Sequence, residues 1–229
     1  MGHHQIFTYG GLTSPAYIGS SAVSAGVVSA FAMNTTAPIA AGDLIVLCVT
    51  CLSAATSFPS AISDGTNSYT LAGTVQSTGA GIFNTSLWYK ENASAVVAGA
   101  TITVTLNTPT TGSGNGLAII ASKIVSTLAS SFDKTAGGNT AAATSITATT
   151  AALAQPIEIA VGTSWSDAGV PTYVGATGFS PASNTSIPGG NGLLVVDYKL
   201  TGATTAVSYV PTWGASGRVL GVVATFKGR

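Results

Sequence analysis

Histidine is the side chain most often used for general acid–base and nucleophilic chemistry, because its pKa lies close to neutrality. The sequence has two histidines, His3 and His4, both at its N-terminal tip, where they are either native or the remnant of a purification tag. A Ser-His-Asp or Cys-His arrangement would have to recruit one of them. A hydrolase triad is therefore a poor interpretation of this sequence.

Pairs of carboxylates are the other common catalytic device, and glycosidases use one on each side of the scissile bond. The acidic residues of this chain are scattered singly, at Asp43, Asp64, Glu91, Asp133, Glu158, Asp167 and Asp197. A pair could form only between distant loops. Asp43, Glu158 and Asp197 flank or interrupt apolar segments, where structural roles suffice to explain them. We therefore predict that the protein is not an enzyme.

Cys48 and Cys51 form a C-x-x-C motif, which elsewhere can be a redox pair or half of a zinc site. Here the motif lies in an extended apolar segment, and residues three apart on a strand point to opposite faces, about 10 Å apart. Zinc would need two further ligands, and His3 and His4 are the only histidines available. The sequence predicts two buried, unreactive thiols, and neither a metal nor a cofactor.

The residues best suited to contact a ligand or a partner are aromatic and charged side chains in two loops. Trp165, Asp167 and Tyr173 lie in TSWSDAGVPTY, and Trp213 and Arg218 lie in PTWGASGR. An aromatic ring beside a carboxylate or a guanidinium can bind a sugar ring or a partner's side chain. The alternative, which the apolar character of tryptophan favours, is that each indole closes one end of the folded domain.

The polar octapeptide SDGTNSYT, residues 63–70, raises the question of a calcium loop. It offers one carboxylate, Asp64, and lacks the alternating oxygen ligands and closing glutamate of an EF-hand. Asp64 and Gly65 stand where a tight turn needs residues that tolerate positive φ. The octapeptide is predicted to be a structural turn.

The composition excludes several classes of partner. Among 229 residues the chain has 7 basic and 7 acidic ones, so that 6% are charged, compared with about 25% in an average soluble protein. Nucleic acids and anionic membranes need clustered Lys and Arg, which this chain lacks. We recognise no export signal and no apolar segment of the length that a membrane helix requires. The 46% of hydrophobic residues predict a folded chain.

Apolar residues alternate or run in short blocks typical of β-strands. TITVTL, residues 101–106, alternates with a period of two, and DLIVLCV, PIEIAVGT, GLLVVDYKL and RVLGVVATF are rich in β-branched residues. NTAAATSITATTAAL, residues 139–153, is ambiguous because alanine favours helix, and its second half is interpreted as a strand. The sequence predicts an all-β fold.

A weak internal repeat sets the expected architecture. LIVLCVT resembles IEIAVGT, LWYK resembles VDYK, ITVTL resembles AVSYV and AIIASK resembles GVVATFK, in the same order. Residues 41–123 and 154–227 would then be two similar four-stranded halves. We predict one antiparallel, jelly-roll-like β-sandwich over 41–229 with strands of both halves in each sheet, preceded by a segment, 1–40, that adds one or two strands.

The succession of AAGDLIVLCVTC, the SDGTNSYT turn, LWYK, TITVTL and GLAIIASK resembles a β-sandwich module of tailed-bacteriophage virion proteins. In that group a GDLLVV strand precedes a D-x-x-G-N-T-Y-T turn, a strand with Trp and a T-V-T-V strand. The likeness covers residues 41–123 best. It implies a structural protein located in the virion, such as a capsid decoration protein, head fibre or tail component.

These observations lead to two functional hypotheses. The first is a non-enzymatic capsid decoration or cement protein, made in the host cytoplasm, that binds the major capsid protein as a homotrimer. Its segment 5–18 could add a strand to a neighbouring copy. The alternative is a glycan- or receptor-binding module of a tail fibre or surface adhesin that uses Trp165, Tyr173 and Trp213.

Overall fold

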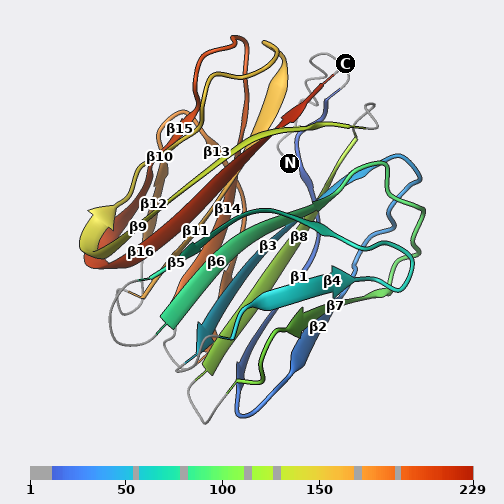
Figure 1. Cartoon of the computed structure of the whole chain (residues 1–229), viewed down its shortest axis with the longest axis vertical. Helices are drawn as coiled ribbons and strands as arrows, with labels where there is room; N and C mark the ends of the chain where they lie inside the picture. The colour runs from blue at the N-terminus through green and yellow to red at the C-terminus, as the bar shows by residue number, and fades with distance from the viewer. Residues whose placement is uncertain are drawn as a thin grey trace, which may run out of the picture.

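The computed structural model describes residues 12–53, 57–77, 82–110, 115–125, 130–167, 172–188 and 192–228. Within these ranges the chain forms sixteen β-strands and no α-helix, and every strand pair is antiparallel (Figure 1). The predicted all-β antiparallel sandwich is confirmed. The same residues contain no helix with the length and hydropathy needed to cross a membrane.

The strands form two units of eight that share one topology. The first unit consists of β1 (Ala16–Ala25), β2 (Ala30–Asn34), β3 (Leu44–Ser53), β4 (Pro59–Ser63), β5 (Thr70–Gln76), β6 (Ile82–Lys90), β7 (Thr101–Leu106) and β8 (Asn115–Ile124). The second consists of β9 (Phe132–Ser145), β10 (Ala148–Thr149), β11 (Glu158–Ser166), β12 (Tyr173–Ala176), β13 (Ser180–Ser186), β14 (Leu193–Leu200), β15 (Ser208–Tyr209) and β16 (Pro211–Lys227).

Each unit has a five-stranded sheet and a smaller outer sheet. The five-stranded sheets have the orders β1-β8-β3-β6-β5 and β9-β16-β11-β14-β13, so that each strand of the first unit corresponds to the strand eight places later. The first outer sheet is β2-β7-β4. In the second unit β10 pairs with β15, and β12 pairs with residues 211–213 of β16, which continue directly from β15. The outer sheets therefore also correspond.

The two five-stranded sheets pack face to face, and each outer sheet covers the opposite face of its own unit. Figure 1 shows the layers in succession, from β10 and β15 at the upper left to β2, β4 and β7 at the lower right. Strand β3 illustrates the consequence, because Val46 and Cys48 point between the large sheets while Ile45 and Leu47 point into the core of the first unit. Inner strands such as β3 are apolar on both faces because both faces are buried.

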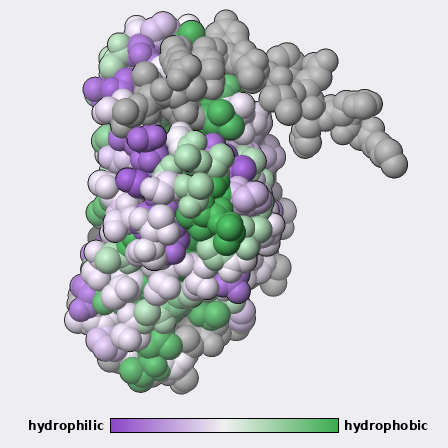
Figure 2. Space-filling view, turned by 90° about the vertical axis from the view of Figure 1, so that its right-hand side faces the viewer, coloured by the Kyte–Doolittle hydropathy of each residue, from purple (hydrophilic) through white to green (hydrophobic). Residues whose placement is uncertain are grey.

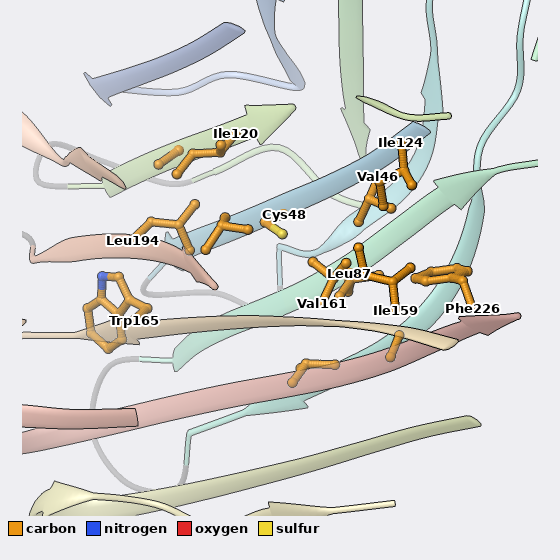
Figure 3. Close-up of a cluster of buried hydrophobic side chains, with 14 of the residues drawn as sticks. Val46, Cys48, Leu87, Ile120, Ile124, Ile159, Val161, Trp165, Leu194 and Phe226 are labelled. Atoms are coloured by element: carbon orange, nitrogen blue, oxygen red, sulfur yellow. The ribbon is translucent and has the colours of Figure 1, made fainter. Parts of the chain in front are cut away.

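The space between the large sheets, called here the sheet interface, is filled by side chains from both units. Figure 3 shows Val46, Cys48, Leu87 and Ile120 of the first unit facing side chains of the second, among them Ile159, Val161, Trp165, Leu194 and Phe226. Phe83 of β6 stacks on Trp165 of β11 with a centroid separation of 4.1 Å. These apolar contacts join the two units into one body.

The contacts across the sheet interface follow an approximate twofold symmetry. Strand β1 lies over β13, and β9 lies over β5. Because β9 is the counterpart of β1 and β5 is the counterpart of β13, these two contacts are equivalent. The contacts of β16 with β6 and of β8 with β14 are related in the same way. The chain is thus arranged like a dimer of two linked copies of one module.

The distribution of strands differs from the sequence-based expectation in one respect. Strands of both repeats were expected in each sheet, whereas each five-stranded sheet takes all its strands from one unit. Each repeat has eight strands because polar segments add four that hydrophobic patterning does not reveal, such as TLAGTVQ in β5 and SPASNTS in β13. A complete unit can cover both faces of its own large sheet, so the strands need not be shared.

The N-terminal segment contributes two strands, β1 and β2, as expected, and both belong to the first unit. Leu12 is fully buried in the sheet interface and Ile18 in the core of the first unit. Leu12 and Ile18 therefore pack on their own chain, and the rest of the expected arm, 5–11, lies outside the described residues.

The ambiguous Ala/Thr segment forms strand in both halves. Residues 139–145 belong to β9, which pairs with β16, and Ala148–Thr149 form β10. Pairing with a long neighbouring strand thus overrides the helix propensity of alanine. The two cysteines behave as predicted, since Cys48 lies in the sheet interface and Cys51 in the core of the first unit, both as free thiols. Burial raises the pKa of Cys48 to about 12 and also raises that of Cys51.

The sheet interface should dominate the stability of the whole chain. Leu87 is fully buried there, so Leu87→Ala should lower the free energy of unfolding by about 2–5 kcal/mol in urea titrations followed by circular dichroism. Val97→Ala, at a side chain that is 76% exposed, is the control and should change it by less than about 0.5 kcal/mol. Equal effects of the two substitutions would contradict this account of the interface.

Candidate functional site

The five candidate residues from the loops form two separate groups. Trp165 is fully buried in the sheet interface, and Arg218 places its guanidinium 3.9 Å from the centroid of Phe83. Nε of Arg218 donates to Oδ2 of Asp167 at 2.6 Å, and the backbone N–H of Arg218 donates to Oδ1 at 2.8 Å. This group holds the start of the buried part of β16 beside the end of β11.

Tyr173 and Trp213 form the second group, in the second unit. Their rings lie 5.0 Å apart, and Trp213 is 1% exposed. The hydroxyl of Tyr173 donates to Oδ2 of Asp197, and the hydroxyl of Tyr209 donates to the same oxygen at 2.7 Å. Neither tryptophan is exposed enough to serve as a platform for a sugar ring, which agrees with the interpretation of the indoles as closing groups.

A pocket of about 530 Å³ opens beside the second group. We call it the Asp197 hollow, and it is lined by Tyr173, Val174, Gly175, Ala176, Thr177, Phe179, Pro181, Asp197 and Thr212. Its walls come from β12, the turn that follows it, β13, β14 and the first residues of β16. It combines an apolar lining with one carboxylate, which is the composition usual for small-ligand sites.

The carboxylate at this site is costly to bury. Asp197 is 1% exposed, and burial raises its pKa, while the two tyrosine hydroxyls act in the opposite direction by stabilising the ionised form. Burial and the neighbouring charge of Asp197 also raise the pKa of Tyr173 and Tyr209, so both phenols remain protonated donors. Both donate to Oδ2, and Oδ1 accepts no hydrogen bond from the residues that the structure describes.

Gly162 makes room for this arrangement. It is the cross-strand neighbour of Asp197, and the ring of Tyr209 lies directly over it. A methyl group at Gly162 would lie 2.5 Å from the Tyr209 ring, closer than carbon atoms can approach. Any side chain here would displace the phenol from the carboxylate.

The SDGTNSYT segment forms the predicted structural turn. Oδ1 of Asp64 accepts the backbone N–H groups of Thr66 and Asn67, Oδ2 accepts the hydroxyl of Tyr69, and Gly65 has a φ of 83°. Burial tends to raise the pKa of Asp64, but these hydrogen bonds outweigh it and lower the pKa. The carboxylate is fully used within its own turn.

One pair of carboxyl groups does meet in the fold. Asp133 at the start of β9 and Glu158 at the start of β11 lie close enough for the charge of Asp133 to act on the pKa of Glu158, and Glu158 is fully buried. Glu158 and Asp133 line neither the Asp197 hollow nor the smaller hollow of the first unit, unlike the open carboxylate pair of a glycosidase. Among the described residues no group of three or more His, Cys, Asp and Glu side chains is placed to hold a metal ion.

The residue that sequence reasoning undervalued is Asp197. It was expected to have a structural role within the apolar segment LLVVDYKL, yet it joins Tyr173, Tyr209 and the hollow. A charged residue in the middle of a segment buried on both faces is a signal in itself, because such a charge is stable only with dedicated partners. Those partners, β12 and β15, are too short to be recognised from sequence.

Comparisons of this chain with protein-family models, with curated proteins and with solved structures found no match.

The carboxyl pair predicts a specific pH dependence. Burial and the Asp133 charge raise the pKa of Glu158 above its unfolded value of about 4.3, so protonated Glu158 stabilises the fold at low pH and this contribution is lost as the pH rises. In Glu158→Gln the amide oxygen can still accept the backbone N–H of Gln155, which donates to Oε1 of Glu158, but the side chain carries no charge. The melting temperature of Glu158→Gln minus that of wild type should therefore increase from pH 4 to pH 7, as measured by circular dichroism.

Asp133→Asn provides the matched control with the opposite sign. Burial tends to raise the pKa of Asp133, but hydrogen bonds from the backbone N–H of Ala154 and from Lys134 lower it overall. Its stabilising contribution is therefore present above its unfolded pKa and is lost as the pH falls. The melting temperature of Asp133→Asn should therefore fall further below that of wild type as the pH rises. Parallel pH profiles for the two variants would contradict the opposite pKa shifts of Asp133 and Glu158.

Proposed function

We propose that this chain is a non-enzymatic structural protein of a tailed-bacteriophage virion, located on the capsid surface as a decoration or cement protein. The observation that carries the proposal is the succession of motifs that resembles the phage module. In the fold these motifs occupy β3, the Asp64 turn, β6, β7 and β8 of one compact unit. The motif order therefore follows the chain path of one folding module, and the second unit repeats it.

The architecture is suited to a passive, load-bearing role. The units are joined by a continuous apolar interface, and most of their connections are short. The surface in Figure 2 is dominated by residues of intermediate hydropathy with small hydrophobic patches between them. With 6% charged residues, contact with a partner such as the major capsid protein would rest on shape, apolar burial and neutral hydrogen bonds.

Purified particles provide the direct test. Quantitative mass spectrometry of virions from the source of the sequence should find the chain at many copies per particle, in a fixed ratio to the major capsid protein. Electron microscopy of particles labelled with an antibody to the chain should place it on the head. Recovery of the chain only from the particle-free fraction would defeat the proposal, and label confined to the tail would move it to a tail component.

We further propose that the working form is a homotrimer. Few charges leave little repulsion between copies, and capsids present threefold positions where a trimer gains multivalent attachment. The exposed alanine and threonine side chains of β9 provide an uncharged surface that neighbouring copies could cover.

Light scattering of the purified chain tests this proposal without particles. At tens of micromolar, the measured mass should be three times the 22.5 kDa of one chain. A trimer that survives removal of residues 1–11 would keep the trimer proposal and discard only the contribution of the N-terminal arm. A monomeric mass in solution, together with single copies on particles, would exclude the trimer.

A further inference from the structure

We propose that the Asp197 hollow is a binding site for a neutral sugar residue, in which Asp197 accepts hydrogen bonds from sugar hydroxyls and Tyr173 and Phe179 supply an apolar wall. This site goes beyond a structural role in the virion and does not depend on it. The volume of about 530 Å³ lies within the range of about 300–1,000 Å³ typical of small-ligand pockets.

The hydrogen bonds of Asp197 indicate which side of the carboxylate a ligand would meet. Tyr173 and Tyr209 both donate to Oδ2 and thereby fix the orientation of the group. Each carboxylate oxygen can accept about two hydrogen bonds. Oδ1 has no donor among the described residues, although Asp197 is 1% exposed and lines the hollow. A ligand with hydroxyl groups could donate hydrogen bonds to Oδ1.

The neighbouring charge favours a hydroxyl donor over a cation. Nζ of Lys199 lies beside the turn at Gly178, 3.7 Å from the position that a methyl group there would occupy. This turn connects β12 and β13, which both line the hollow. The ammonium group of Lys199 would repel a cation that approaches along this turn, whereas a neutral sugar could use the carboxylate and the hydroxyls of Thr177 and Thr212, which line the hollow.

The apolar side of the hollow is held rigidly. The Tyr173 ring packs on buried Trp213 and the Phe179 ring on buried Tyr209, each with a centroid separation of 5.0 Å. Aromatic rings fixed in this way lose little side-chain entropy when they pack against the C–H face of a sugar. Trp213 thus supports the wall from behind instead of contacting a ligand itself.

The first unit contains a hollow at the corresponding place, between β4, β5 and β6. It has a volume of about 220 Å³ and is lined by Phe58, Pro59, Leu71, Thr74, Gln76, Asn84, Ser86 and Trp88. Val49 corresponds to Gly162 when LIVLCVT is aligned with IEIAVGT. Ser86 lies opposite Val49 and Asp197 lies opposite Gly162, so the strand register makes Ser86 the counterpart of Asp197. The sequence alignment of LWYK with VDYK would instead pair Trp88 with Asp197.

The hollow is common to both units, but the buried carboxylate is found in the second unit. Both units leave a hollow at this place, but in the first Trp88 narrows it and donates its indole N–H to Oγ of Ser86 at 3.1 Å. The second unit instead has a buried carboxylate with two phenol donors, and a glycine that admits one of them. Burying a charge reduces stability, so this arrangement points to a function in the second unit.

The first experiment uses the wild-type protein. Saturation-transfer NMR with the methyl glycosides of glucose, galactose, mannose, N-acetylglucosamine and N-acetylgalactosamine should show transfer to the C–H protons of at least one of them. The same sugar should shift the amide signals of Gly175, Ala176 and Thr177, and should leave those of the first unit's hollow in place. Absence of binding by all five sugars, or amide shifts elsewhere, would overturn the proposal. Binding of methylamine but no sugar would overturn the sugar assignment.

Two variants and a matched control then test the residues. Asp197→Asn keeps an oxygen for the two tyrosine hydroxyls but turns the other side of the group into a donor, so affinity for the sugar should fall at least tenfold. Phe179→Ala removes part of the apolar wall and should also weaken binding of the sugar. Leu71→Ala, in the hollow of the first unit, should leave binding unchanged. Unchanged affinity of Asp197→Asn, with its native amide spectrum retained, would exclude Asp197 as the acceptor.

Discussion

The burial of two five-stranded sheets against each other is the constraint on which the rest of the structure depends. Because an outer sheet covers the other face of each unit, the inner strands β3, β8, β11 and β16 have no solvent-facing side over much of their length. Alternation of polar and apolar residues is then lost, and segments such as EIAVGTSWS are buried throughout. Polar residues there, such as Thr50 and Thr163, donate to backbone carbonyls of neighbouring strands.

The same constraint limits where charge can be placed and how the sheet edges are protected. Edge strands are commonly guarded by charged side chains, but β5 and β13 have none. Instead the pairing of all four edge strands of the large sheets, β1, β5, β9 and β13, is interrupted by a register shift, whereas the inner pairs are regular. Bulges bend an edge away from further pairing, so irregular backbone takes the place of charge here.

The two units show how one module can diverge while its framework is kept. Their strand orders and mutual contacts correspond through the approximate twofold, so the framework residues satisfy the same packing in both. At the hollow between the fourth, fifth and sixth strands of each unit, packing restricts the choice of side chain less. There the first unit has a serine bonded to an indole, and the second has a buried carboxylate bonded to two phenols. Differences at such a place alter chemistry without altering the fold.

The sequence by itself determined the fold class, the central strands and the turn at Asp64, because these follow from local signals. Period-two patterns, β-branched segments and the Asp-Gly pair act over a few residues. The separation of Cys48 and Cys51 onto opposite faces also followed from strand geometry alone. The order of the repeat could be recognised because its apolar strands are similar in both units.

Only the tertiary structure decided how the strands divide between sheets and which side chains meet. Edge strands such as β5 and β13 are polar and are stabilised by pairing, so no hydrophobic pattern marks them in advance. The Asp197 hollow joins residues from 173 to 212, and the Asp133–Glu158 contact joins the starts of two strands. Neither can be read from spacing, because a one-residue change of register would direct each side chain to the other face of its sheet.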